Sequence, residues 1–365
     1  MKILKALKLK MQRSIIHYRI NRKKVKVVFM IPNLGTGGAE RVFAFVSQHL
    51  NPDKFATELL VMGKSEQTTY QVDKIPVTYL DKNRVLHAVP GIYRFLRNKR
   101  PDIVLSSIGH LNMVAGVMAV LLPSIRFIIR PASVGSEEEG SWQAKKCFAQ
   151  AHSVLCQSRD MAHNFQKRYG IPDEKITIIG NPVRDTGEID APDVIDQTHN
   201  LVTVGRLDPI KGHARILNIL AQLDRDFHYT IIGDGPEKEN ILNQIDNLRL
   251  NDKITHIPHT DKVNDYLIQN DLFLQGSYSE GFPNAVLESC AVGTPALAFD
   301  VPGGTKEIIE HGTNGFLVAD EQEYLTLLQA DHHWKRNEVS RSVLSKFGSQ
   351  TVLDQYENLL VSCLD

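Results

Sequence analysis

The chain has 365 residues with 42 basic and 42 acidic side chains, so its length predicts two domains and its overall charge is neutral. The four cysteines, Cys147, Cys156, Cys290 and Cys363, show no C-x-x-C spacing, which argues against a disulfide framework or a zinc site and favours a reducing compartment. The longest apolar run, residues 113–122, is too short to span a bilayer.

The beginning of the chain concentrates positive charge. Residues 1–26 hold ten basic side chains and no acidic one, which leaves 32 basic against 42 acidic residues in the rest. Within residues 1–24, apolar side chains such as Leu4, Leu7 and Met11 recur at helical spacing between lysines. This pattern predicts a basic amphipathic helix that lies on an anionic membrane surface. A solvated arm and a helix packed on the same chain are the alternatives.

The predicted location is the cytoplasm, because residues 1–26 lack the hydrophobic core and the small-residue cleavage site of a signal peptide. Together with the basic arm, this predicts a peripheral protein on the inner face of the plasma membrane. Nucleic acid is not an expected partner, since no nucleic-acid-reading motif or aromatic platform accompanies the basic residues.

A continuous apolar run over residues 25–31 predicts a buried strand that leads into a glycine-rich turn, Gly35-Thr-Gly-Gly-Ala-Glu-Arg41, and a helix. The turn lacks the dinucleotide fingerprint G-x-G-x-x-G. It nevertheless allows the backbone to come close to a phosphate or a sugar. Gly37 and Gly38 are therefore candidates for a phosphate or acceptor loop, although a plain tight loop has the same pattern.

Strand and helix patterns alternate in this half, which predicts a parallel sheet with helices on both faces. Ligands bind such sheets beyond the carboxyl ends of the strands. His110 and Arg130 each follow a strand end and are candidate site residues, although a loop histidine without a role is an equal alternative for His110. The further strands are expected at residues 58–62, 103–106, 127–129, 153–156 and 176–179.

The second half repeats the alternation after a change in composition. Residues 186–199 are acidic and contain turn formers, which predicts an inter-domain linker. The turn Gly205-Arg-Leu-Asp-Pro-Ile-Lys-Gly212 then places Arg206 and Lys211 at the carboxyl end of a strand, and Gly235 lies in the next such turn. Two cations at one strand end favour an anionic ligand.

Residues 276–288 contain the central candidate site. Glu280 and Glu288 bracket a small-residue turn that leads into a helix. Pro283 suits the start of that helix and Asn284 suits its cap, and the free N–H groups of the first turn would favour an anion. A carboxylate can accept two hydrogen bonds from a ribose diol. The segment therefore suits a nucleotide-sugar, whereas two glutamates at this spacing are also common as surface charges.

From residue 25 to its end, the chain resembles the retaining glycosyltransferases of family four. The resemblance implies a GT-B fold of class α/β, with two Rossmann-like doubly wound domains facing a cleft and a C-terminal helix that crosses back to the N-terminal domain. It rests on the two glycine-rich turns, the Glu280…Glu288 stretch, Gly180-Asn-Pro-Val183, Gly233-Asp-Gly-Pro236, Gly293-Thr-Pro295 and Pro302-Gly-Gly-Thr305.

The resemblance also implies roles for single residues. Glu280 would contact the donor sugar near the reacting carbon, with His110 nearby, and Glu288 would hold the ribose. Arg206 and Lys211 would bind the diphosphate, whose developing charge they would stabilise. The other implied residues are Gly281, Phe282, Pro283, Asn284 and Gly235 on the donor side, and Gly37, Gly38 and Arg130 on the phosphate or acceptor side.

The resemblance implies retention at the anomeric carbon and no metal or other cofactor. One pattern suggests a metal instead, because Asp224-Arg-Asp226 has the D-x-D spacing of metal-dependent glycosyltransferases. This segment is expected between a helix and a strand start, on the side away from the predicted cleft. A metal site there is accordingly the weaker interpretation.

The predicted domains follow from these boundaries. They are a membrane-contact helix (1–24), an N-terminal acceptor-side domain (25–185), a linker (186–199), a C-terminal nucleotide-sugar-binding domain (200–335) and C-terminal helices packing back on the N-terminal domain (336–365).

The predicted function is retaining transfer of a sugar, favouring a UDP-linked hexose or N-acetylhexosamine, to a lipid-linked saccharide in bacterial capsule, O-antigen or lipopolysaccharide synthesis. A UDP-sugar 2-epimerase-like isomerase is one alternative, which the membrane-seeking arm disfavours. A non-catalytic nucleotide-sugar-binding scaffold is another, which the joint presence of both glutamates, Arg206 and Lys211 disfavours. The sequence leaves open the donor, the acceptor, the linkage and the oligomeric state.

Overall fold

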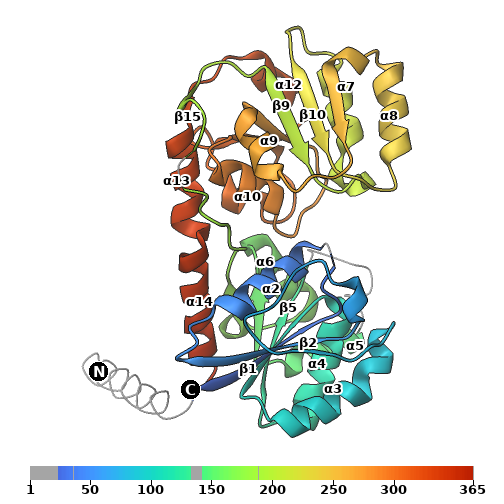
Figure 1. Ribbon diagram of the computed structural model, residues 1–365, viewed down its shortest axis with the longest axis vertical. Coiled ribbons are helices and arrows are strands. Elements are labelled where there is room, and N and C mark those ends of the chain that lie inside the picture. Colours follow the sequence, from blue (N-terminus) through green and yellow to red (C-terminus); the bar gives the residue numbers. More distant parts are fainter. Residues whose placement is uncertain (1–23, 36, 133–141, 188, 365) are drawn as a thin grey trace, which may run out of the picture. The chain divides into compact units, whose positions relative to one another are not determined.

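The computed structural model describes residues 24–35, 37–132, 142–187 and 189–364. They form two compact units (Figure 1). The first unit contains the described residues up to Gln157, Met161–Ile179 and those from Val352 onward, and the second contains Ser158–Asp160 and the described part of Gly180–Thr351. The predicted basic helix, apart from Lys24, lies outside the described residues.

The first unit is built on a seven-stranded parallel sheet with the order β3-β2-β1-β4-β5-β6-β7, so the first strand lies inside the sheet. This order is typical of a doubly wound α/β domain. The strands are β1 (Val25–Ile31), β2 (Phe55–Val61), β3 (Val77–Tyr79), β4 (Ile103–Ser107), β5 (Arg126–Arg130), β6 (Ser153–Cys156) and β7 (Ile176–Ile178).

Strand β1 shows why its sequence is apolar throughout. Successive side chains of a strand point to opposite faces of the sheet. Val28 and Met30 accordingly enter one hydrophobic core, and Val27 and Phe29 enter the core on the other face. The helices that cover the sheet are α2 (Gly38–His49), α3 (Val85–Lys99), α4 (Gly109–Leu121), α5 (Trp142–Gln150), α6 (Arg159–Tyr169) and α14 (Ser349–Ser362), with short 3-10 turns at Ser65–Gln67 and Asp173–Lys175.

The second unit repeats the plan with a six-stranded parallel sheet of order β11-β10-β9-β12-β13-β14. Its strands are β9 (Asn200–Val204), β10 (His228–Ile232), β11 (Ile254–Ile257), β12 (Leu272–Gln275), β13 (Ala296–Phe299) and β14 (Gly315–Val318). Its helices are α7 (His213–Leu220), α8 (Lys238–Asn247), α9 (Val263–Gln269), α10 (Asn284–Ala291), α11 (Thr305–Ile308), α12 (Glu321–Gln329) and α13 (Arg336–Phe347), with 3-10 turns η4 (Pro209–Lys211) and η5 (Asn251–Lys253).

The prediction of two Rossmann-like α/β halves is confirmed. Both sheets are parallel, and helices follow the strands as the alternating pattern indicated. Among the helices in the described ranges, none is both long enough and apolar enough to cross a membrane. In both sheets, the loops that contain the candidate site residues follow the carboxyl ends of strands.

The structure divides the chain at different points from those predicted. Gly180 already belongs to the second unit, so this unit begins before residue 186. The expected linker contains β8 (Val194–Ile195), which pairs antiparallel with β15 (Trp334–Lys335). Helix α13 also belongs to the second unit, because its apolar face, including Val339, is buried in that core. The assignment of all of residues 336–365 to the first unit is thus corrected for α13.

Helix α14 is the element that crosses to the first unit. Its side chains Val352, Tyr356 and Leu360 are buried in the same core as Phe29 and Phe43, next to β1 and α2. The C-terminal end of the chain accordingly completes the hydrophobic core of the N-terminal unit, as the expected crossing helix requires.

Glu357 adds a polar attachment between α14 and the first unit. Its carboxylate accepts a hydrogen bond from the backbone N–H of Asn51 at 2.9 Å and pairs with Lys54 Nζ at 2.8 Å. The residue is 8% exposed, so removing its carboxylate leaves a partly buried N–H group without its partner.

We expect Glu357→Ala to lower the melting temperature by about 4–8 °C, because the loss of such a hydrogen bond costs roughly 2 kcal/mol. The matched control is Asn358→Ala, which changes an exposed residue of the same helix and should leave the melting temperature nearly unchanged. Calorimetry of both variants measures the difference. An equal effect of the two substitutions would contradict the proposed role of the Glu357 contacts.

Candidate active site

The candidate site in the second unit centres on the carboxylate of Glu280, which follows β12. Glu280 is 8% exposed and accepts four hydrogen bonds. Lys211 Nζ lies 2.7 Å from Oε1 and 2.9 Å from Oε2, Ser277 Oγ donates at 2.6 Å, and Gln275 Nε2 donates at 3.2 Å. A buried carboxylate needs such partners to remain ionised. The structure therefore joins two of the predicted site residues, Lys211 and Glu280, in one ion pair.

The approach of two loops makes this pair possible. Gly212, which follows η4, has φ +63°, and a Cβ atom there would meet the carbonyl oxygen of Gly276 at 2.0 Å. Tyr278 N–H also donates to the carbonyl oxygen of Ile210 at 2.8 Å. The absence of a side chain at Gly212 lets the loop after β9 touch the loop after β12, and this contact brings Lys211 to Glu280.

Two more loops pack at the same edge. A Cβ atom on Gly303, whose φ is +129°, would meet the Glu280 carbonyl oxygen at 1.6 Å, and Glu280 N–H donates to the Pro302 carbonyl at 3.0 Å. At the predicted residue Gly235, a Cβ atom would meet the Leu207 carbonyl oxygen at 2.5 Å. The glycine motifs that carried the resemblance thus permit close backbone contacts between loops.

Arg206 has a different environment from Lys211. Its side chain is 70% exposed, and its Nε atom pairs with Asp208 at 2.9 Å. The two predicted cations therefore belong to the same loop but differ in burial, with Lys211 held by Glu280 and Arg206 at the surface.

The start of α10 differs in detail from the prediction. Pro283 is the N-cap residue and Asn284 is the first helical residue, and neither side chain caps the helix. Asn284 Oδ1 instead accepts a hydrogen bond from Asn181 Nδ2 at 2.7 Å. The expectation that Asn284 caps α10 is corrected, because the side chain of Asn181, from the Gly180-Asn-Pro-Val183 motif, already engages its amide.

The remaining donor-side candidates lie around the same helix. Phe282 is buried and packs edge-to-face on Phe347 at a centroid distance of 5.4 Å, so its ring supports the core. Gly281 is half-buried in the loop before it. Glu288 is half-buried in the second turn of α10. The structure places both glutamates of the motif in the second unit, with Glu280 in the loop and Glu288 on the helix.

Sequence reasoning missed Arg215 on α7, which supports the loop that carries Glu280. Its guanidinium lies 3.4 Å from the ring centroid of Phe299 and 4.2 Å from that of Tyr278, and it donates to the Ser277 carbonyl at 2.5 Å. Partial burial lowers the pKa of Arg215, and the neighbouring Tyr278 opposes this effect. No spacing signal links these three segments, because they meet only in the folded unit.

The first unit positions the other predicted residues. His110 is exposed in the first turn of α4, just after Ile108, whose φ of +79° marks a sharp change of chain direction. Arg130 ends β5 and is 2% exposed, with its guanidinium 5.7 Å from the centroid of the Phe43 ring. Gly37 is the N-cap residue of α2 and Gly38 its first residue.

Glu40 is a second residue that sequence reasoning missed. It is 8% exposed, and a Cβ atom on Gly37 would meet its carboxylate Oε2 at 2.1 Å. Burial raises the pKa of Glu40, while a backbone hydrogen bond and the charge of Arg130 act in the opposite direction. The sequence did contain a signal for Glu40, because this residue belongs to the glycine-rich turn Gly35-Thr-Gly-Gly-Ala-Glu-Arg41 that carries the resemblance. The first unit thus gathers Gly37, Glu40 and Arg130.

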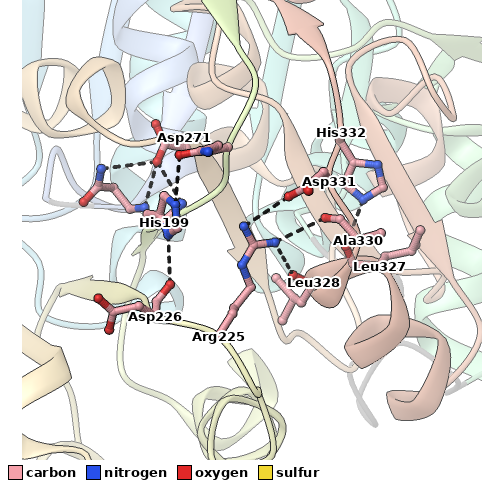
Figure 2. Close-up of polar contacts among 11 residues, drawn as sticks. His199, Arg225, Asp226, Asp271, Leu327, Leu328, Ala330, Asp331 and His332 are labelled. Carbon is pink, nitrogen blue, oxygen red and sulfur yellow. Dashed lines mark hydrogen bonds and ion pairs between the residues drawn. The ribbon is translucent and has the colours of Figure 1, made fainter.

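Hydrogen bonds connect the D-x-D segment, Asp224-Arg-Asp226, to other segments of the second unit. Figure 2 shows the Arg225 guanidinium bonded to the carbonyl oxygens of Leu328 and Ala330 and to the carboxylate of Asp331. The carbonyl oxygen of Asp226 bonds His199 Nδ1 at 3.0 Å. Within the described ranges, no group of three or more His, Cys, Asp or Glu side chains is placed to hold a metal ion.

The two halves match two family models. Residues 36–186 match the model described as Glycosyltransferase Family 4, and residues 187–342 match the one described as Glycosyl transferases group 1. Because the two matches together span most of the chain and the two-unit architecture agrees, the chain belongs to this family of GT-B glycosyltransferases.

Known relatives match this chain over different shares of their length. The chain is 23% identical to the N-acetylgalactosamine-N,N'-diacetylbacillosaminyl-diphospho-undecaprenol 4-alpha-N-acetylgalactosaminyltransferase of Campylobacter jejuni, over 82% of this chain and 87% of that protein. A 28% identical match to an uncharacterized glycosyltransferase of Haemophilus influenzae covers 45% of this chain and about half, 49%, of that protein.

Solved structures show the same architecture. The lipopolysaccharide outer core galactosyltransferase WaaB in its apo form aligns with a TM-score of 0.77 and 21% identity, over 93% of this chain and 99% of its own. HepE of Anabaena, in complex with UDP, aligns with a TM-score of 0.75 and 17% identity, over 93% and 100%. At these identities the likeness shows the fold alone.

We expect Glu40→Gln to raise the melting temperature at pH 8 and to leave it unchanged at pH 4. Since the pKa of Glu40 is raised in the folded state, the folded protein binds this proton more tightly than the unfolded chain. Stability is therefore lost as the pH rises through the raised pKa, and glutamine removes that loss. Melting curves recorded between pH 4 and pH 8 test this prediction. The control is Glu66→Gln, which changes an exposed residue. A lower melting temperature of Glu40→Gln at pH 8 would show that attraction to Arg130 outweighs burial.

Proposed function

We propose that the protein is a retaining, metal-independent glycosyltransferase that moves a sugar from a UDP-sugar to a lipid-linked saccharide during bacterial surface polysaccharide synthesis. The observation that carries this proposal is the ion pair between half-buried Lys211 and buried Glu280, held among four backbone loops at the carboxyl edge of the second sheet. Ligands of open α/β sheets bind at this edge.

The donor side of the proposal follows from charge. When the bond between the anomeric carbon and the diphosphate breaks, negative charge grows on the departing oxygen. Lys211 is a compact cation at this position, and exposed Arg206 offers a guanidinium that can grip phosphate in two-point contact. In this role, Lys211 shifts part of its interaction from Glu280 to the diphosphate, and Glu280 is then able to accept hydrogen bonds from the donor sugar.

The chemistry that we propose is attack from the face that the leaving group vacates. The acceptor oxygen forms the new bond to the anomeric carbon as the bond to the diphosphate breaks, and the acceptor proton passes to the departing phosphate oxygen. This route keeps the configuration and needs no covalent enzyme intermediate. His110 and Arg130, from the first unit, are the proposed sugar and phosphate contacts, and Glu288, from the second, is the proposed ribose ligand.

The relatives support the substrate classes. HepE is described in complex with UDP, and the Campylobacter relative is named for an acceptor on diphospho-undecaprenol. We propose by this likeness that the present protein also takes a UDP-sugar and a lipid-linked acceptor, working as a peripheral protein at the inner face of the plasma membrane, with neither metal nor other cofactor. The isomerase and scaffold alternatives predict no transfer to any acceptor.

Glu280→Ala is expected to lower the rate of sugar transfer by about 100-fold or more, because a polar contact to the reacting sugar is lost. Binding of the donor should remain measurable as a thermal shift, since a ligand that binds the folded state raises the melting temperature. The matched control, Glu239→Ala, removes an exposed carboxylate of α8 in the same unit.

The thermal-shift measurement uses UDP-, GDP-, ADP- and dTDP-sugars without added metal, and we expect the UDP class to give the shift. Normal transfer by Glu280→Ala would refute the role of Glu280. A shift with another nucleotide class would refute the choice of UDP while leaving the site in place.

Deleting residues 1–24 is expected to release the protein from vesicles that contain anionic lipid. Each basic residue near such a surface contributes roughly 1 kcal/mol, and ten of them lie within residues 1–26. Co-sedimentation with anionic vesicles, compared with vesicles of neutral lipid, measures the effect. Undiminished binding of the shortened protein would exclude this segment as the anchor.

A further inference from the structure

The first unit contains an apolar groove of which the proposed chemistry uses only His110. It has a volume of about 520 Å³, which is within the range of ligand-binding pockets. The groove lies among the start of α3, one side of α4 and the middle of α5. Its lining residues are Arg84, Val85, Leu86 and Val89, then His110, Met113, Val114 and Val117, and finally Cys147.

Helix α4 contributes apolar side chains to the lining of the groove. Its sequence is hydrophobic on nearly all sides, as in a helix that is covered all round. Yet Val117, Val120 and Leu121 are 46%, 61% and 53% exposed. On the neighbouring helices, Leu86 of α3 is 77% exposed and Trp142 of α5 is 64% exposed. Of these exposed side chains, Leu86 and Val117 line the groove itself, and Val120, Leu121 and Trp142 lie elsewhere on the three helices that form it. Exposed apolar side chains in a groove of this size indicate a binding surface.

The polar lining of the groove is confined to two residues, of which Arg84 is a cation. Arg84 is the exposed N-cap residue of α3, and His110 lies in the first turn of α4. Across the described part of the chain, Arg84 makes no ion pair. The rest of the lining is aliphatic or sulfur-containing. An anionic head group attached to a hydrocarbon chain matches this distribution, with the charge at Arg84 and the chain along α4.

We propose that this groove binds the hydrocarbon chain of the lipid-linked acceptor, with the acceptor's diphosphate beside Arg84. The proposal rests on the proposed function, because it assigns a place to the lipid part of that acceptor. It also gives His110 a position where the groove meets the candidate site residues of the first unit. The hydrocarbon chain of the acceptor thereby contributes binding energy away from the reacting sugar.

Cys147 provides a direct reporter of the groove. Among the four cysteines, Cys147 is half-buried and lines the groove, whereas Cys156, Cys290 and Cys363 are buried. Modification of the native protein by N-ethylmaleimide should therefore report mainly on Cys147, and the Cys147→Ala variant should lose this reaction. The probe is farnesyl diphosphate, which has a short isoprenoid chain, and inorganic diphosphate is the chainless comparison.

We expect farnesyl diphosphate, at ten times its dissociation constant, to slow modification about tenfold, and inorganic diphosphate to have no effect. Val117→Asn and Leu86→Ser should weaken this protection, because each replaces an apolar side chain of the groove. Val120→Asn is the matched control, since Val120 is exposed on the same helix but does not line the groove. Equal rates with and without farnesyl diphosphate would overturn the proposal.

Transfer assays separate this proposal from the proposed function. With a long-chain acceptor, Val117→Asn should raise KM by about tenfold and leave kcat unchanged, while a chainless acceptor should show no difference. An unchanged ratio of the two KM values would overturn the groove proposal alone. If the native protein transferred sugar to none of the acceptors, that result would instead count against the proposed function. The Cys147 labelling experiment would still decide whether the groove binds a hydrocarbon chain.

The other possible occupant is the basic N-terminal segment of the same chain. If that segment fills the groove, the full-length double variant Leu7→Ser and Met11→Ser should react faster at Cys147 without any lipid. That outcome would overturn the proposal in favour of an internal partner. An unchanged rate, together with protection by farnesyl diphosphate, supports the acceptor chain as the occupant.

Discussion

The candidate site of the second unit depends on one interaction, the ion pair between half-buried Lys211 and buried Glu280. A carboxylate with 8% exposure is costly unless cations and hydrogen-bond donors surround it. Lys211, Ser277 and Gln275 supply them here, and all come from loops or strand ends at the carboxyl edge of one sheet. Because Glu280 is buried whereas the Lys211 side chain is 32% exposed, replacing Lys211 would leave a buried carboxylate without its cation.

Backbone contacts hold that pair in place. Gly212 against Gly276 and Gly303 against Glu280 bring loops to distances that a Cβ atom would prevent. Arg215 also holds the loop, because it donates to the Ser277 carbonyl and contacts the rings of Tyr278 and Phe299. The result is a closely packed frame for the cation of Lys211, which in the proposed function exchanges its carboxylate partner for a phosphate. Such preorganised charge is what a developing diphosphate anion requires.

The first unit has the same architecture as the second but a different surface. Its carboxyl edge carries Gly37, Glu40 and Arg130, while the outer side of α4 remains apolar and exposed. Helix α14 returns from the end of the chain to complete its core. A polar edge next to an apolar groove is consistent with a substrate that has both a saccharide and a lipid part, and this is the class of acceptor that we propose.

The sequence by itself determined the α/β class, most strands of the two sheets and the motif residues, but not the short strands β3 and β8. The alternation of apolar runs with helical patterns and the glycine-bearing turns are local signals. Tertiary structure alone decided the partners. The contact of Lys211 with Glu280 spans 69 residues, and that of Asn181 with Asn284 spans 103, so no spacing rule reveals them. The same holds for the placement of α13 in the second unit and for the burial of Glu40. Long-range packing fixes which side chains meet, and local sequence signals do not encode it.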